Sequence, residues 1–272
     1  MTTKKNHIFI GWDNREVLAS IVAKYSMSLH ITNEDDCSIE FLKRRSLQTQ
    51  HLYYRKAFLS ETGQYFDTLD SKPFSTEFSF SRFLVPELCR LQQKDGWAMF
   101  VDGDFVFLDD VTKLFSLVNN KYAVMCVKFN WVPPKEERYK LDGMIQTRYS
   151  KKLWSSLMMF NLQHPDIKNL TRTVVNDSTG SYLHKFRWTS KENIGTLPIS
   201  WNYVPEITSK SIEPKAIHYT IGGPWFEEYR NCPYGEIWIE YLNKIPKNFL
   251  TNNLLRQYNE KRFYSCNIFC CA

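Results

Sequence analysis

Two aspartates interrupt a strongly apolar stretch in the middle of the chain, AMFVDGDFVFLDD at residues 98–110. Asp102 and Asp104 are separated by a single glycine, and hydrophobic residues flank the triplet on both sides. Carboxylates are hard oxygen donors that suit Mg²⁺ or Mn²⁺, and such a cation can bridge the oxygens of a diphosphate. Gly103 permits a backbone bend and the close approach of a ligand. The triplet therefore indicates a divalent-cation site, with the turn of a hairpin as the alternative interpretation.

A histidine late in the chain offers a third ligand for such a cation. His218 follows an apolar pair in AIHYTIGGPWFEEY, residues 216–229, and a turn containing Gly222 and Gly223 comes shortly after it. Backbone N–H groups in a glycine-rich turn can bind phosphate oxygens. A buried structural histidine is the alternative, but the adjacent turn favours a ligand.

Hydrophobic patterning predicts the elements that position these residues. Short buried strands are expected where apolar residues cluster, and helices where they recur every three to four residues. The first half contains these segments in order: a strand at 7–12, a helix at 15–30, a strand at 38–45 and a helix at 79–97. Pro86 lies inside the last pattern and weakens it as one continuous helix.

The pattern continues in the same alternation after residue 97. The expected segments are a buried strand at 98–108, a helix at 109–119, a strand at 122–129, a polar loop at 130–152 and a strand at 153–162. Strands that alternate with helices predict an α/β fold with a largely parallel sheet flanked by helices. Ligands of such sheets collect beyond the carboxyl ends of the strands, where Asp13 and the Asp102–Asp104 triplet are expected to lie.

Composition sets limits on the class of protein. The chain has 272 residues, a net charge of +6 and 43% hydrophobic residues, which suits one large globular domain. A positive charge favours an anionic partner such as a nucleotide. Basic residues are scattered rather than gathered in a stripe, so a dedicated nucleic-acid module is not indicated.

The cysteines and the two ends of the chain bear on where in the cell the protein is expected. The seven cysteines form no CxxC pair, which argues against a zinc site and a disulfide framework, and Cys89 and Cys126 are expected to be core thiols. No secretory signal is evident, and no apolar run approaches the roughly 20 residues that span a bilayer. We expect a soluble cytoplasmic protein with a Cys-rich tail at 256–272, either loosely packed or lipidated and in peripheral contact with a membrane.

Several of these segments together resemble glycosyltransferase family 8 and its bacterial and viral relatives. The resemblance is carried by the Asp102–Gly103–Asp104 triplet after a hydrophobic strand, by WSSLMMFN at 154–161, by LPISWNYV at 197–204 and by His218 with its glycine-rich turn. It covers roughly residues 7–230 in order.

The resemblance implies a GT-A fold with a Rossmann-like mixed sheet flanked by helices. It further implies the retaining transfer of a hexose from a nucleotide-sugar, expected to be a UDP-sugar, with Mn²⁺ or Mg²⁺ as cofactor. Residues 1–255 would form a single catalytic domain. Its first part, 1–125, would bind the nucleotide-sugar, and 126–255 would bind a hydroxyl acceptor of unknown kind and supply the metal-binding histidine.

Individual roles follow from matching positions. Asp102, Asp104 and His218 match the metal ligands of the family. Asp13 matches the end of the first strand, which contacts the nucleoside; Arg82 matches a basic residue near the donor, and Gly222 a glycine that faces the diphosphate. The full set expected at the donor is Gly11, Asp13, Arg15, Arg82, Asp102, Gly103, Gly222 and Gly223.

Two departures from the family pattern leave the catalytic group open. Gly223 stands where the family commonly has a lysine that contacts phosphate, and no Asp-Gln-Asp segment precedes LPISWNYV. The residue facing the anomeric carbon therefore does not transfer. The candidates, chosen for their place near strand ends and loops, are Lys128, Asp142, Gln146, His184 and Asn202.

Two other functions stay open, and the first of them follows from the same departures. The chain could be a nucleotide-sugar-binding protein with weak or no transferase activity. It could also direct transferase chemistry at hydroxyls of DNA or RNA, although the scattered basic residues argue against nucleic acid as a partner.

Overall fold

A six-stranded sheet forms the centre of the part of the chain that the computed structural model describes, residues 5–33, 37–130, 139–140, 144–145, 147, 151, 153–246 and 249. Its order is β12-β8-β11-β6-β1-β2. The strands are β1 (Asn6–Gly11), β2 (Cys37–Leu42), β6 (Trp97–Val101), β8 (Val124–Cys126), β11 (Leu157–Asn161) and β12 (Ile194–Thr196). β1 pairs in parallel with β2 and β6, and β12 with β8, whereas β11 runs antiparallel between β6 and β8. The sheet is therefore mostly parallel, with one reversed strand.

Both faces of this sheet are buried. Along β6, Ala98 and Phe100 pack into one hydrophobic cluster, and Met99 and Val101 pack into another on the opposite face. All four side chains are fully buried. A strand covered on both faces needs apolar residues at every position, which is why the sequence here is continuously hydrophobic rather than alternating.

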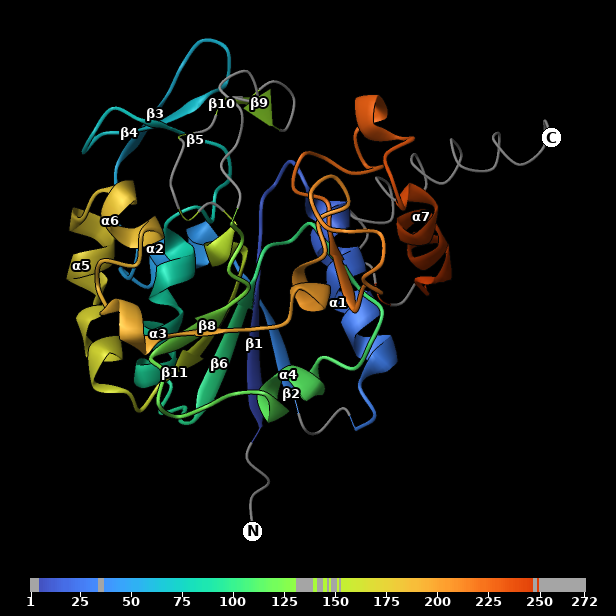
Figure 1. The fold of residues 1–272 in the computed structure, drawn as a ribbon. Coiled ribbons are helices and arrows are strands. Elements are labelled where there is room, and N and C mark those ends of the chain that lie inside the picture. Colours follow the sequence, from blue (N-terminus) through green and yellow to red (C-terminus); the bar gives the residue numbers. More distant parts are fainter. Residues whose placement is uncertain are drawn as a thin grey trace, which may run out of the picture.

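Helices cover the two faces in separate groups (Figure 1). One face packs against α2 (Arg44–Thr49), α3 (Val85–Leu91), α5 (Arg172–Asp177) and α6 (Gly180–His184). The other face packs against α1 (Val17–His30) and α4 (Thr112–Ser116). α7 (Gly235–Lys244) packs on the outer side of α1, where Tyr25 donates a hydrogen bond to the carbonyl of Lys244 at 2.7 Å.

Short 3₁₀ helices connect many of these elements. They are η2 (Ser81–Leu84), η3 (Trp154–Ser156), η4 (Pro165–Asn169), η5 (Lys191–Asn193), η6 (Ile199–Asn202) and η7 (Glu227–Tyr229). η2 and η3 both reach the end of β6, because Arg82 of η2 pairs with Asp102 and Ser156 of η3 accepts a hydrogen bond from the amide of Asp102.

Small antiparallel sheets lie beside the central sheet. β7 (Phe105–Phe107) pairs with β13 (Ala216–His218), and β3 (Ala57–Leu59), β4 (Tyr65–Asp67) and β5 (Pro73–Phe74) form a second sheet. β9 (Tyr139–Lys140) pairs with β10 (Met144–Ile145), and the amide of Ile145 donates to Gln64 Oε1 at 2.5 Å. In Figure 1 the β3–β5 sheet and the β9–β10 pair stand together above the end of the central sheet.

The stretch at 98–108 differs from the single strand that the sequence predicts. It divides into β6 and β7, which belong to different sheets and do not pair with each other, so the hairpin alternative is also wrong. The helix expected at 109–119 is limited to α4, where Asp110 Oδ1 accepts a hydrogen bond from the amide of Thr112. The pattern at 79–97 divides at Val85, because Pro86 is tolerated in the first turn of α3 and not in the middle of a helix.

The structure describes the residues behind some of the remaining expectations and not those behind others. Cys89 and Cys126 are buried thiols, and burial raises the pKa of each to about 12. In the part of the chain that the structure describes, no helix is long and apolar enough to cross a bilayer. The Cys-rich tail at 256–272 and most of the loop expected at 130–152 lie outside the described residues.

Gly103 is required by a close approach of two chain segments rather than by an unusual backbone angle. A Cβ atom at this position would lie 2.4 Å from Ser20 Oγ and 2.6 Å from the carbonyl oxygen of Gly11. Ser20 Oγ itself donates a hydrogen bond to that carbonyl at 3.1 Å. The β6–β7 connection therefore lies directly against the end of β1 and the first turns of α1, which holds the two aspartates at a fixed place.

We predict that Gly103→Ala lowers the free energy of unfolding by about 1–3 kcal/mol, because the added methyl group has no space. Urea denaturation measures the loss. The same change should cost less in a Ser20→Ala background, since the nearest obstructing atom is gone while the Gly11 carbonyl remains. Equal losses in the two backgrounds would contradict the close approach.

Candidate functional site

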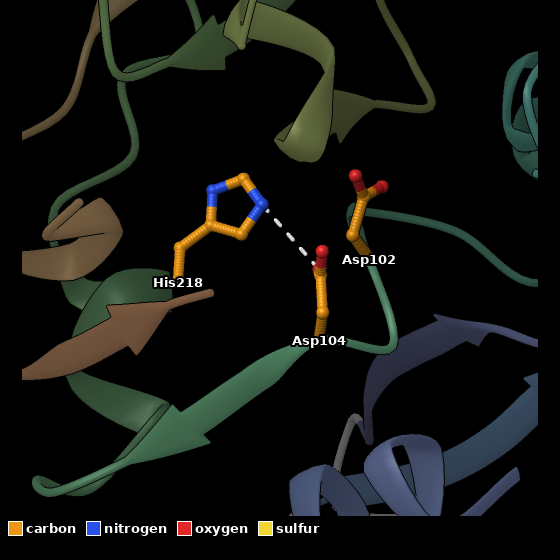
Figure 2. Close-up of side chains that lie close together, drawn as sticks. All are labelled: Asp102, Asp104 and His218. Carbon is orange, nitrogen blue, oxygen red and sulfur yellow. Dashed lines mark ion pairs between the residues drawn. The ribbon is translucent and has the colours of Figure 1, made fainter. Parts of the chain in front are cut away.

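Asp102, Asp104 and His218 come together at the carboxyl end of the central sheet (Figure 2). Each offers one ligand atom, and these atoms lie within 4.8 Å of one another. His218 Nε2 lies 3.4 Å from Asp104 Oδ1. All three side chains are buried, with His218 fully inaccessible to solvent. The structure thus brings together the three residues that the sequence predicts as metal ligands.

The β7–β13 ladder sets the position of His218 relative to Asp104. His218 pairs with Phe105 in this ladder, and the amide of Tyr219 donates to the carbonyl of Asp104 at 3.0 Å. The imidazole also stacks on the Phe105 ring, with 4.3 Å between the ring centroids. Backbone hydrogen bonds and a ring contact therefore fix the two side chains from segments more than a hundred residues apart.

A chain of hydrogen bonds orients the imidazole from behind. His218 Nδ1 lies 2.9 Å from Asn202 Oδ1, and Asn202 Nδ2 donates to Ser156 Oγ at 2.8 Å. Ser156 Oγ in turn donates to the carbonyl of Leu153. With the amide oxygen facing it, Nδ1 carries the proton, and the lone pair of Nε2 points toward Asp104. Asn202, which the sequence offers as a catalytic candidate, is fully buried behind His218 and does not line the pocket described below.

Arg82 neutralises one of the two aspartates. Its Nη1 lies 2.8 Å from Asp102 Oδ1 and also donates to the carbonyl of Ser155 at 2.8 Å. Burial lowers the pKa of Arg82, and the charges of Asp102 and Asp104 oppose that shift. An arginine remains protonated at neutral pH, so Arg82 and Asp102 form a buried ion pair.

A pocket of about 100 Å³ opens beside the two aspartates. Its lining comes from the β5–η2 region, the β6–β7 connection, η3 and the end of α6. The lining residues are Pro73, Phe74, Ser75, Thr76, Ser79, Phe80, Arg82, Asp102, Asp104, Thr147, Lys151, Leu153, Ser155, Ser156 and His184. The volume is smaller than the roughly 300–1,000 Å³ of pockets that enclose drug-sized ligands, so it suits one part of a larger ligand.

Some residues expected at the donor lie next to this pocket without lining it. Arg15 pairs with the buried Asp13 at 2.8 Å and also donates to the carbonyl of Ser75. Asp13 Oδ2 accepts from the amide of Glu77 at 3.1 Å. The two residues thus tie the β1–α1 loop to the segment that carries Ser75. A Cβ at Gly11 would lie 2.7 Å from the Phe78 ring, so Gly11 is in van der Waals contact with the same segment.

The glycines of the late turn are surrounded by aromatic rings. A Cβ at Gly222, where φ is +154°, would lie 2.5 Å from the Tyr229 ring, and a Cβ at Gly223 would lie 2.0 Å from the Trp225 ring. Packing inside the turn therefore accounts for both glycines. Neither of them lines the pocket.

The catalytic candidates fall in different places. His184 lines the pocket, and its Nδ1 lies 2.9 Å from Ser155 Oγ. Lys128 Nζ donates to the carbonyl of Ile194 at 2.6 Å and does not line the pocket. Asp142 and Gln146 lie outside the described residues.

Sequence reasoning assigned no role to Ser155, Ser156 and Lys151, which line the pocket. Ser155 and Ser156 precede β11, and the amide of Asp102 donates to the carbonyl of Ser156 at 2.8 Å. Because β11 runs antiparallel to β6, its first residues lie at the edge where β6 ends. The sequence does show a polar pair, Ser155 and Ser156, directly before a buried strand. That pair could have been assigned to the pocket only if the direction of the strand in the sheet had been known.

Comparison with known proteins places this site in context. No protein-family model matches the chain. Protein CDI of Arabidopsis thaliana is 40% identical over 251 residues, which make up 90% of this chain and 88% of that protein. The chain belongs to the family of Protein CDI.

Solved structures show which fold this Protein CDI relative has. The bifunctional glycosyltransferase WbbM has a TM-score of 0.59 at 12% identity, over 94% of this chain and 51% of that one. GlyE of Streptococcus pneumoniae has a TM-score of 0.53 at 13% identity, over 96% and 64%. An active-site mutant of LgtC has a TM-score of 0.54 at 10% identity, over 89% and 98%.

These likenesses establish the fold. The chain spans about half the length of WbbM and nearly all of LgtC. It has the mixed α/β fold of these glycosyltransferases, as the sequence predicts, and the cluster of Asp102, Asp104 and His218 lies at the carboxyl end of its sheet.

We predict that Arg82→Met lowers the free energy of unfolding by about 3–5 kcal/mol, because Asp102 is left as an unpaired buried charge. Urea denaturation at pH 7 without added metal measures the loss. Adding Asp102→Asn to the variant should recover part of it, since the remaining group is neutral. Losses that simply add in the double variant would contradict the ion pair.

Proposed function

We propose that the chain is a metal-dependent glycosyltransferase that moves a hexose from a UDP-sugar to a hydroxyl acceptor with retention, as in family 8. The observation that carries the proposal is the convergence of Asp102, Asp104 and His218 next to a small polar pocket, on a glycosyltransferase fold. LgtC is a galactosyltransferase that has been solved with donor and acceptor sugar analogues, which supports a site for two sugars on this fold.

The three side chains fit a divalent cation. Oxygen ligands of Mg²⁺ at about 2.1 Å lie roughly 3 Å apart when adjacent and about 4 Å apart when opposite, so a cluster within 4.8 Å needs only small side-chain shifts. Two carboxylates and one imidazole suit Mn²⁺ as well as Mg²⁺. When bound, the cation would supply positive charge to offset the charge that develops on the departing UDP.

The residues of the chain prepare this site before any ligand arrives. Arg82 holds Asp102 in place through the ion pair, and Asn202 holds His218 with its Nε2 lone pair toward Asp104. Such preorganisation lowers the cost of stabilising charge during reaction. In the proposed transfer the bond from the anomeric carbon to UDP breaks, a bond to the acceptor oxygen forms on the same face, and the acceptor proton is released.

A nucleotide-sugar-binding protein without efficient transfer is the second candidate. It is favoured by Gly223, which stands where family 8 commonly has a phosphate-contacting lysine and which packs against the Trp225 ring. Binding of UDP with Mn²⁺ in the absence of turnover would support this candidate.

We predict that the chain hydrolyses UDP-sugars slowly to UDP in the presence of Mn²⁺ and that Asp104→Asn lowers the rate by about 10²–10⁴-fold, because a key electrostatic group is lost. Release of UDP in a coupled assay measures the rate. Asp109→Asn, at a partly exposed carboxylate outside the pocket that pairs with Lys113 and Lys215, serves as the matched control. Undiminished hydrolysis by Asp104→Asn would refute the metal assignment.

A second prediction concerns the residue behind His218. Asn202→Ala should weaken Mn²⁺ binding by about 10–100-fold, because the imidazole loses the partner that fixes its tautomer and orientation. Isothermal titration calorimetry with Mn²⁺ measures the affinity. Asn193→Ala removes an amide that donates to Asp166 outside the site and should leave the affinity unchanged. Equal affinities in both variants would argue against a positioning role for Asn202.

A further inference from the structure

One wall of the pocket beside the aspartates carries an ammonium group, that of Lys151, which the proposed reaction does not use. Lys151 and His184 line it from segments outside the β6–β7 connection, together with hydroxyl groups of Thr147 and Ser155. His184 Nδ1 and Ser155 Oγ lie 2.9 Å apart, so the imidazole and the hydroxyl form one polar unit at this wall.

The Lys151 ammonium is held in a defined place. It donates to the carbonyl of Lys185 at 3.0 Å and lies over the rings of Trp154 and Phe186, at 5.1 and 5.6 Å from their centroids. An ammonium has three N–H groups, so one backbone hydrogen bond leaves capacity for two more. Aromatic faces attract a cation without neutralising its charge. The ammonium therefore retains a net charge that an anionic ligand can satisfy.

Negative groups in the lining are confined to one place. Among the described residues that line the pocket, Asp102 and Asp104 are the only carboxylates, and no asparagine or glutamine side chain is present. Arg82 already pairs with Asp102, and both aspartates belong to the proposed cation site. Hydroxyl groups of the lining can hydrogen-bond to any sugar, but they carry no charge, and no described carboxylate forms an ion pair with the Lys151 ammonium.

The position of the pocket indicates which part of a donor would enter it. A diphosphate bridged by a cation at Asp102 and Asp104 would lie at the wall that these residues form. The group attached to that diphosphate would then occupy the rest of the pocket, whose whole volume of about 100 Å³ suits a sugar ring better than a larger nucleoside. In a nucleotide-sugar, the attached group is the sugar that is transferred.

On the basis of the proposed function, we propose that the transferred sugar is a uronic acid, whose carboxylate is bound by Lys151 with His184 and Ser155 beside it. A carboxylate at C6 supplies the charge-assisted acceptor that the ammonium lacks among the described lining residues. The bonds made and broken in the transfer are those already described, since the carboxylate takes no part in them.

Binding of matched donors to the full chain tests this inference. With Mn²⁺ present and no acceptor, calorimetry compares UDP alone, UDP-glucose with UDP-glucuronic acid, and UDP-galactose with UDP-galacturonic acid. Within each pair the donors differ only at C6. We expect at least one uronic acid to bind about 10–100-fold more tightly than its hexose partner, as a hydrogen-bonded charge would provide. Since no acceptor is present, the preference belongs to the donor.

Variants assign the preference to Lys151. Lys151→Met should bring the ratio within a pair close to one and leave the affinity for UDP itself within about twofold. Lys191→Met removes the same charge from an exposed neighbour that does not line the pocket, and it should keep the native ratio. Lys151→Gln serves as a second variant if Lys151→Met does not fold, and thermal melting checks the fold of each.

The outcomes separate the two proposals. If UDP binds with Mn²⁺ but neither uronic acid is preferred, the inference fails and the proposed function stands. If Lys151→Met weakens UDP as much as the uronic-acid donor, Lys151 serves the diphosphate and the inference is overturned. If UDP does not bind at all, the proposed function fails and the inference falls with it.

Discussion

Two buried carboxylates at the end of β6 are the constraint on which the site depends. Asp102 and Asp104 are each less than a tenth exposed, and charges at that depth are stable only beside opposite charge or donors. The Arg82–Asp102 ion pair satisfies one of them, and Arg82 is anchored in turn by the carbonyls of Phe78 and Ser155. Asp104 lies 3.4 Å from His218 Nε2, and the charge of a cation held by both side chains would satisfy it. The close packing of η2, η3 and β13 around the sheet end follows from these pairings.

Much of the fold was predictable because it rests on local patterning. The strands at the start of the chain, at β6 and at β8, and the helix α1 all follow from runs and spacings of apolar residues. The meeting of Asp102 and Asp104 with His218 was also predicted. The two aspartates were expected at the carboxyl end of a buried strand, and His218 was added from its glycine-rich turn and the resemblance to family 8. The role of Ser155 was not predicted, because the reversed direction of β11 is decided by pairing with β6 and β8 and leaves no mark on the local sequence.

Residue type alone does not say why a glycine is present. The sequence suggests that Gly103 lets a ligand approach and that the N–H groups of the turn at Gly222 and Gly223 face phosphate. In the structure, the space where a Cβ would lie is filled at each of the three by Ser20, Tyr229 or Trp225. A glycine needed for close packing and a glycine needed for a ligand look identical in a sequence, because both are defined by what lies beside the missing side chain. The comparisons also differ in what they show. The 40% identity to Protein CDI shows the family of the chain, whereas the likeness to WbbM at 12% identity shows the fold alone.

The ladder between β7 and β13 has a consequence for the dynamics of the site. His218 and the residue next to Asp104 are joined by backbone pairing, so fraying of this two-stranded sheet would move an aspartate and the histidine out of place at the same time. Local opening of proteins occurs in such cooperative units. Hydrogen exchange at the amides of β7 and β13 would then report, through a single opening event, whether Asp104 and His218 are held in place together.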